Sequence, residues 1–215
     1  MKICIWKLSP SSLDQTKQDA LITSLPFGRE EQERLRALKH PVQRQRSLCA
    51  LLALRALVGK SEKDLTICRE ADGKPYFADR PDLSFSLTHT NTLCAAALSE
   101  GEGAIGLDME PLLPDRRLES IVSRFFLPEE QDAFRTAEDP TLCFYRFWTQ
   151  KEAIAKQSGK GLAVHFAAKS FPPRPTRHVK ITHGKNTSVL CVVSETPMRQ
   201  LSVLTAPKSI GWQEI

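Results

Sequence analysis

The sequence predicts an α+β protein made of two pseudo-symmetric subdomains, each a small, mostly antiparallel sheet packed with helices. Three observations lead to this prediction. Helical periodicity dominates two stretches of the chain, short strand-like runs follow each of them, and one polar, glycine-rich segment lies near the middle, at residues 99–103. A chain of 215 residues is long enough for two units of about 100 residues each. We therefore predict an N-terminal subdomain of residues 1–102 and a C-terminal subdomain of residues 103–215.

Helices should come first in the N-terminal half, followed by strands. Pro26-Phe27-Gly28 is a breaker between the first two helices. In the third helix Leu48, Leu51 and Leu52 recur at helical spacing, and Gly59 is typical of a helix end. The expected elements are helices at 12–24, 29–39 and 42–58, a turn at 72–75, and strands at 83–88 and 93–99.

The C-terminal half should begin with a strand, continue with helices and end with strands. Pro128 fits the first turn of a helix, and Glu129 and Glu130 suit its positive dipole end. The expected elements are a strand at 104–110, helices at 117–126, 128–136 and 141–158, and strand-like runs at 179–182, 188–193 and 201–205.

The composition excludes several classes of protein. Charged residues make up 26% and hydrophobic residues 41% of the chain, which excludes disordered and fibrous proteins. The longest strongly apolar run, Leu48 to Leu54, is far shorter than the roughly 20 residues of a bilayer-spanning helix, so no membrane partner is expected. No secretory signal follows Met1. The six cysteines include no C-x-x-C pair, so we expect reduced thiols in a cytoplasmic protein.

The net charge of +5 conceals a strong segregation of charge along the chain. Residues 29–60 hold eight Lys and Arg against three Glu, and residues 151–185 hold eight against one. Between them, residues 100–139 hold eleven Asp and Glu against four Arg. An acidic centre between basic flanks suits a divalent metal and a polyphosphate. The alternative is that each run is an ordinary solvated helix face.

Asp108 and Glu110 are the first candidate site. On a strand they face the same side, while Leu107 and Met109 face the core. Two adjacent carboxylates repel each other unless a cation lies between them, and Mg²⁺ is commonly held by a few carboxylates together with substrate phosphates. Two solvated acids at a strand end are the other interpretation.

The helix predicted at 141–158 carries the second candidate. Trp148, Glu152 and Lys156 are spaced by four residues and share one face, with Lys151 beside Glu152. This face is either a surface ion pair or a metal ligand next to a lysine that neutralises phosphate charge.

Three weaker candidates lie in the N-terminal half. Thr88 and His89 end a predicted strand with a hydroxyl and an imidazole, Gly73-Lys74-Pro75 is a turn from which a lysine could reach an anion, and Arg46 lies on the third helix. Each of these alone is more often structural than functional.

The order of these motifs resembles that of a known family. Gly-Lys-Pro, S-L-T-H, I-G-L-D-M-E, F-F-x-P-x-E and W-x-x-K-E-A-x-x-K follow one another, with Gly159-Lys160-Gly161-Leu162 after them, and the resemblance covers residues 29–171. The series is similar to that of the 4′-phosphopantetheinyl transferases, in particular the broad-specificity class named after the surfactin-synthetase activator (Sfp-type). The resemblance also implies the fold of this family, with the active site between the two subdomains.

The resemblance implies a holo-acyl-carrier-protein synthase. Such enzymes transfer the phosphopantetheine arm of coenzyme A to a serine of an acyl carrier protein or of a peptidyl or aryl carrier domain, in fatty-acid, polyketide or nonribosomal peptide synthesis, and release adenosine 3′,5′-bisphosphate. Mg²⁺, or Mn²⁺ in its place, would be held by Asp108, Glu110 and Glu152. Glu152 would also accept the serine proton, and Lys156 would neutralise charge on the pyrophosphate.

The same resemblance implies the coenzyme A contacts. Thr88 keeps the hydroxyl that a serine supplies in many members. The implied contacts are Asp108 and Lys156 at the pyrophosphate end, Thr88 as a hydrogen-bond partner of phosphate, Arg46 and His89 at the 3′-phosphate, and Lys74 and Pro75 near the adenine and that phosphate.

Some positions fit the family pattern less directly. Glu130 matches the acid of the F-F motif, either beside the metal ligands or as an alternative ligand. Members often carry two lysines facing the 3′-phosphate, and here Arg34 takes one place while Glu31 takes the other. The tail after Phe171 matches no part of the pattern.

The expected partners are coenzyme A and an acidic carrier protein, which the basic segments beginning at residues 29 and 151 would meet. No nucleic-acid partner is expected, because Phe125, Phe126, Phe147 and Trp148 are spaced as core residues near acids. Another interpretation is a family member that binds coenzyme A or a carrier without catalysing transfer. The sequence argues against it, because it retains all of Asp108, Glu110, Glu152 and Lys156. We expect a monomer, as is typical of members of this length.

Overall fold

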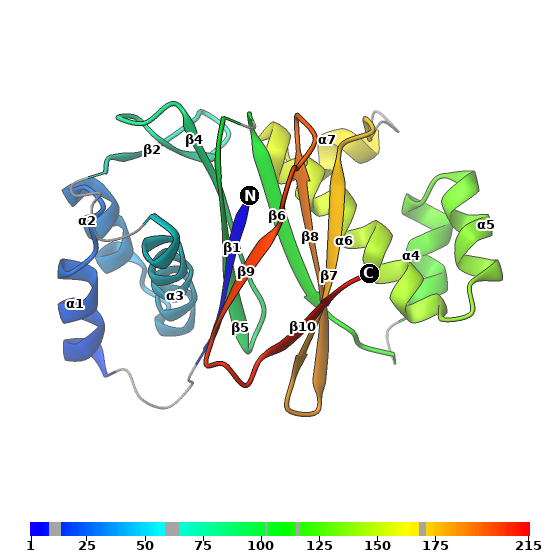
Figure 1. Ribbon diagram of the computed structural model, residues 1–215, viewed down its shortest axis with the longest axis horizontal. Helices are drawn as coiled ribbons and strands as arrows, with labels where there is room; N and C mark the ends of the chain where they lie inside the picture. Colours follow the sequence, from blue (N-terminus) through cyan, green and yellow to red (C-terminus); the bar gives the residue numbers. More distant parts are fainter. Residues whose placement is uncertain (9–13, 59–64, 102, 115–116, 168–170) are drawn as a thin grey trace.

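Two sheets lie in the middle of the molecule, with helices on both outer sides (Figure 1). The computed structural model describes residues 1–8, 14–58, 65–101, 103–114, 117–167 and 171–215. The predicted α+β class with mostly antiparallel sheets is confirmed. Within the described part of the chain, none of the helices has the length and apolar character needed to cross a bilayer.

The first sheet has the strand order β4-β5-β1-β9. β1 (Lys2–Lys7) pairs antiparallel with β5 (Leu93–Glu100) and parallel with β9 (Ser202–Ala206), while β4 (Leu83–His89) pairs antiparallel with β5. Thr90 and Asn91 lie in the β4–β5 connection, where the Thr90 amide donates to the Leu93 carbonyl over 2.7 Å. Because β9 comes from the C-terminal tail, both ends of the chain contribute to this sheet. The subdomain boundary at residues 102 and 103 stays a prediction.

The second sheet is antiparallel throughout and has the order β10-β7-β8-β6. Its strands are β6 (Ile105–Pro111), β7 (Thr176–His183), β8 (Asn186–Ser194) and β10 (Gly211–Glu214). A small separate hairpin joins β2 (Ile67–Arg69) to β3 (Pro75–Phe77). Its turn places Gly73 at φ 90°, a left-handed conformation that a side chain would strain.

The helices divide between the two outer faces (Figure 1). On one face lie α1 (Gln15–Thr23), α2 (Arg29–Ala37) and α3 (Pro41–Val58). On the other lie α4 (Leu118–Phe125), α5 (Pro128–Thr136), α6 (Pro140–Ser158) and α7 (Leu162–Ala167). Apart from α7, these helices match predicted ones to within a few residues. Residues 12 and 13 of the first predicted helix, and the predicted helix end at Gly59, lie outside the described residues.

The two sheets pack against each other through alternating residues. Leu93, Ala95 and Ala97 of β5 face the second sheet, whereas Ala96 and Leu98 face α3 and its neighbours. All of β5 except Glu100 is buried, because one face meets a sheet and the other meets helices. The small alanine side chains allow both layers to come close to this strand.

The residues of β6 alternate between the core that lies between the two sheets and the side that faces α6. Ile105, Leu107 and Met109 pack between the sheets, so that the intervening residues, Gly106 and Asp108 among them, face α6. A Cβ atom at Gly106 would fall on the carbonyl oxygen of Ala153 in α6. The absence of a side chain at this position therefore sets how closely α6 approaches β6.

Replacing Gly106 with alanine should push α6 away from β6. We expect the Gly106→Ala variant to lose about 1–3 kcal/mol of unfolding free energy, measured in denaturant, because overpacking forces the backbone to shift. Gly28→Ala is the matched control, since its Cβ would meet its neighbours only at ordinary contact distance, 3.7 Å or more. Equal stability of the Gly106→Ala variant and the wild type would contradict the close approach.

Candidate active site

A cavity of about 600 Å³ lies where an edge strand of one sheet meets an edge strand of the other. β4 and β6 are joined there by two serine hydroxyls, which accept hydrogen bonds from the β6 backbone: Ile105 N to Ser84 Oγ at 3.2 Å, and Leu107 N to Ser86 Oγ at 3.0 Å. The walls come from α3, the β2–β3 turn and β4 on one side, and from β6 and α6 on the other. The volume is in the usual range for a small-molecule site.

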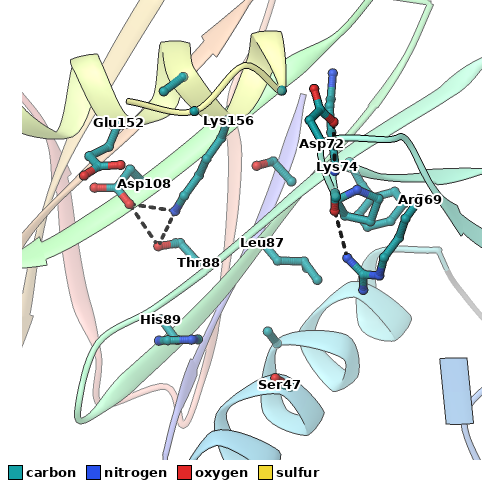
Figure 2. A pocket seen from close by; sticks show the side chains of 18 of the residues that line it. Ser47, Arg69, Asp72, Lys74, Leu87, Thr88, His89, Asp108, Glu152 and Lys156 are labelled. Carbon is teal, nitrogen blue, oxygen red and sulfur yellow. Dashed lines mark hydrogen bonds and ion pairs between the residues drawn. The ribbon is translucent and has the colours of Figure 1, made fainter. Parts of the chain in front are cut away.

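The centre of the cavity is an ion pair between the two layers of the C-terminal half (Figure 2). Lys156 Nζ of α6 lies 2.7 Å from Asp108 Oδ1 of β6. The Thr88 hydroxyl of β4 accepts a hydrogen bond from Lys156 Nζ over 3.3 Å and donates one to Asp108 Oδ1 over 3.4 Å. Asp108 is 6% exposed, and its second oxygen, Oδ2, is buried without a hydrogen-bond partner in the described part of the chain.

Two further carboxylates, those of Glu110 and Glu152, line the same cavity. Burial, reinforced by the negative charge of Asp108, raises the pKa of Glu152 to about 7, against the opposing effect of Lys156. A cation placed among these acids would offset the repulsion between their carboxylates, and it would give Asp108 Oδ2 a partner. The oxygen donors suit a hard cation such as Mg²⁺, so the residues fit the implied metal. Among the described residues, no three acidic, histidine or cysteine groups are already arranged as a metal site.

The residues expected at the nucleotide end of coenzyme A do not all line the cavity. Lys74, Pro75, Thr88 and His89 line the cavity. The Lys74 ammonium donates to the Gln157 carbonyl near the end of α6, over 2.5 Å, and thus connects the β2–β3 turn to that helix. Arg46 is not among the described lining residues; its Nη2 donates to Asn91 Oδ1 over 2.6 Å.

His89 lies at the edge of the cavity (Figure 2). Its ring is exposed on one side, yet partial desolvation, followed by the positive charge of Arg46, lowers its pKa. Arg46 therefore acts on the same region electrostatically, although it does not line the cavity.

Several lining residues carry no sequence motif. Ser47 of α3, Arg69 of β2 and Asp72 of the β2–β3 turn line the cavity, as does Arg34 of α2. Of these, only Arg34 was expected to contact the ligand, on the family resemblance. No local sequence pattern marks Arg69, because its charged partner Glu31 lies 38 positions away in the sequence.

Glu130 forms an ion pair with the residue that precedes Glu152. Lys151 Nζ lies 2.8 Å from Glu130 Oε1 and 2.7 Å from Glu130 Oε2. Oε2 also accepts a hydrogen bond from the Leu127 backbone amide over 2.8 Å. Lys151 is 2% exposed and lies 4.1 Å from the centre of the Phe171 ring. Glu130 is absent from the described lining of the cavity. The pair joins α5 to α6, one residue before Glu152.

Comparison with known proteins places these residues in a family. A family model described as the 4′-phosphopantetheinyl transferase superfamily matches residues 104–203, which include Asp108, Glu110, Glu152 and Lys156. This match confirms the resemblance to the 4′-phosphopantetheinyl transferase superfamily. The enzyme class expected from the motif series is confirmed.

Several curated relatives are similar to this chain. It is 28% identical over 221 aligned positions to the 4′-phosphopantetheinyl transferase HetI of Nostoc sp., covering 99% of this chain and 90% of that protein. It is 34% identical over 142 residues to a putative 4′-phosphopantetheinyl transferase of Synechocystis sp., covering 62% of this chain and 57% of the relative. The 4′-phosphopantetheinyl transferase Sfp of Bacillus subtilis is 29% identical over 141 residues, covering 63% and 61%. The last two alignments span less than two thirds of the relatives' own length.

The Lys151–Glu130 pair should contribute to the stability of the folded chain. Removing one partner leaves a buried charge without compensation, so we expect Lys151→Met to lower the unfolding free energy by about 3 kcal/mol. The double variant Lys151→Met/Glu130→Gln should recover part of that loss, because neither charge then remains. Denaturant unfolding of both single variants and the double variant measures the coupling, and strictly additive losses would show that the pair is not coupled.

Proposed function

We propose that this chain transfers the 4′-phosphopantetheine arm of coenzyme A, in a Mg²⁺-dependent reaction, to a serine hydroxyl of an acyl or peptidyl carrier protein. The products are the holo-carrier and adenosine 3′,5′-bisphosphate. The observation that carries the proposal is the arrangement of Asp108, Lys156 and Glu152 in one cavity whose far wall is basic. An acidic end suits a metal with the pyrophosphate, and a basic end suits the remaining phosphate of coenzyme A.

Asp108, Glu110 and Glu152 would hold the Mg²⁺. A bound Mg²⁺ supplies charge neutralisation on the pyrophosphate, which weakens the repulsion of the incoming oxygen. The buried, unpartnered Oδ2 of Asp108 supports its role as a ligand. Thr88 and Lys156 offer a hydroxyl and an ammonium at the same place, and both suit phosphate oxygens.

The reaction is a displacement at the β-phosphorus of coenzyme A. The carrier serine oxygen forms the new bond to that phosphorus, and the bond from the phosphorus to the oxygen bridging the two phosphates breaks. The serine proton goes to Glu152, directly or through a water molecule. Negative charge develops on the departing oxygen of adenosine 3′,5′-bisphosphate, and Lys156 stabilises it. Positioning and electrostatic stabilisation, rather than covalent catalysis, carry such phosphoryl-type transfers.

The partner is proposed to be an acidic carrier protein. Gly159 and Gly161 line the cavity, and Lys160 between them is exposed, so this part of the cavity rim offers a cationic side chain to a partner. The resemblance to Sfp supports the broad-specificity class, and we propose that the chain acts as a monomer. The basic segments found in the sequence are the proposed docking region.

Intact-mass spectrometry of apo-carrier proteins tests the proposal. Incubation of several apo-carriers with this protein, coenzyme A and Mg²⁺ should add one phosphopantetheine arm to a carrier. EDTA should abolish the gain, and Glu152→Gln should slow it by at least about a hundredfold, because the variant loses both a ligand and a base. Glu138→Gln is the matched control, since Glu138 lies on a separate pocket of the C-terminal half.

The outcomes separate the parts of this proposal. A gain that persists in EDTA would contradict the metal requirement. No gain on any carrier, together with no binding of coenzyme A, would overturn the proposed function.

A further inference from the structure

The turn that follows α6, residues 159–161, forms part of the cavity rim. Gly159 and Gly161 line the cavity, and both have φ 75°, a left-handed conformation that glycine adopts readily. Lys160 lies between them and is exposed. Because the two glycines have no side chains to pack, other groups must hold the backbone that presents Lys160.

A serine–histidine pair holds this turn from behind. Ser158, the last residue of α6, is hydrogen-bonded to His165 of α7, with 2.8 Å between Ser158 Oγ and His165 Nε2. The same hydroxyl accepts a hydrogen bond from the Lys160 amide over 3.3 Å and donates one to the Ala155 carbonyl over 3.1 Å. These three bonds use the whole capacity of a hydroxyl, one donor and two acceptors, when His165 donates from Nε2.

His165 is itself fixed by its surroundings. It is only 8% exposed, and its ring stacks on that of Phe171, with 5.4 Å between the ring centres. Phe171 in turn lies 4.1 Å from the ammonium of Lys151. A buried imidazole is costly unless it is hydrogen-bonded, and Ser158 supplies such a bond. The stacking sets the plane of the ring, and the hydrogen bond sets its direction.

The pair acts on the second part of the turn. Gly159 is held separately, because its amide donates to the Ala155 carbonyl over 3.0 Å and the Asp72 carboxylate lies against it. A Cβ atom at Gly161, by contrast, would meet no described atom within 4 Å, so close packing does not hold that residue. The bond from the Lys160 amide to Ser158 is therefore what orients the backbone at Lys160.

A cation in a fixed position suits the acidic carrier that is proposed as the acceptor. Lys160 forms no ion pair within the described part of the chain, so its ammonium is available to a carboxylate of a partner. A side chain presented from an ordered backbone loses less conformational freedom on association than one presented from a mobile turn. Order in this turn therefore favours binding of the carrier.

We propose that Ser158 and His165 are positioning residues that fix the direction of Lys160, so that its ammonium meets a carboxylate of the carrier protein beside the cavity. The pair acts through Lys160, and it therefore affects the KM for the carrier rather than the chemical step. This inference rests on the proposed transferase function.

Transfer assays at low ionic strength and saturating coenzyme A, with the apo-carrier concentration varied, test the proposal. Lys160→Gln should raise the carrier KM about threefold, the size expected for an exposed ion pair, and should change kcat less than about twofold. Ser158→Ala should have the same effect, because Lys160 loses its direction. The double variant should be no worse than Lys160→Gln alone, since the serine then has no ammonium to position. Lys208→Gln, at an exposed lysine between β9 and β10, is the control and should leave the carrier KM unchanged.

Two variants of His165 test its part in the device. His165→Leu keeps an apolar side chain of similar reach but loses the hydrogen bond, so we expect it to raise the carrier KM as Ser158→Ala does. His165→Gln offers a carboxamide that can donate or accept near the position of Nε2, and it should retain the carrier KM of the wild type. If His165→Leu does not fold, His165→Gln decides, and a threefold rise in its carrier KM contradicts the role of the imidazole.

The remaining outcomes separate the device from the function on which it rests. A roughly ninefold rise in the carrier KM of the double variant, the product of two independent effects, would overturn the proposal. So would an unchanged carrier KM in Ser158→Ala, or a loss confined to kcat or to the KM for coenzyme A, and each of these would leave the transferase function standing. No transfer to any carrier by the wild type would overturn the proposed function together with this inference.

Discussion

The contact between α6 and β6 is the constraint on which the site depends. α6 carries Glu152 and Lys156, while β6 carries Asp108 and Glu110, and these groups act together only if helix and strand are held a few ångströms apart. Gly106 permits that distance because it places no Cβ against the Ala153 carbonyl. Apolar residues of α6, including Ile154, then seal the contact against β8. The chemistry of the cavity therefore depends on packing at a residue with no chemical function.

The two halves of the chain contribute different charged residues to the cavity. Three of the acids come from β6 and α6, whereas most of the cations come from α2, β2 and the β2–β3 turn, which also carries Asp72. For the proposed donor, coenzyme A, neither set alone would suffice, because its pyrophosphate would need a metal site and its monoester would need cations. The Lys74 contact with the Gln157 carbonyl and the serine bonds between β4 and β6 connect the two sets. The buried Lys151–Glu130 pair performs a similar task behind α6, where it joins that helix to α5.

Much of the fold could be predicted because its elements are long and periodic. α3 and α6 show helical spacing, and β4, β5 and β6 are apolar runs bounded by turns. The short elements β1, β2, β3, β10 and α7 were not predicted, since three to six residues carry too little periodicity. The strand run at 201–205 was predicted, but its parallel pairing with β1 was not, because a contact between the two ends of a chain leaves no local signal.

The candidate site likewise contains residues that the sequence predicts and residues that it does not. Asp108, Glu110, Glu152 and Lys156 could be predicted because strand and helix spacing put them on defined faces. Glu130 matched a motif, and sequence alone left open a place near the metal; its ion pair with Lys151 depends on the α5–α6 packing. Arg69 had no sequence signal, because its contacts with Glu31 and the Gly73 carbonyl form only in the folded chain. The partner of Lys74 is a backbone carbonyl, which no residue type reveals.

The central claim is that one ligand spans both halves of the chain. Hydrogen–deuterium exchange of the full chain, with and without coenzyme A and Mg²⁺, tests it most directly. The account predicts slower exchange on ligand addition in two regions at once, residues 69–76 around the β2–β3 turn and residues 155–162 at the end of α6. Protection confined to one of these regions would contradict a site shared between the two halves.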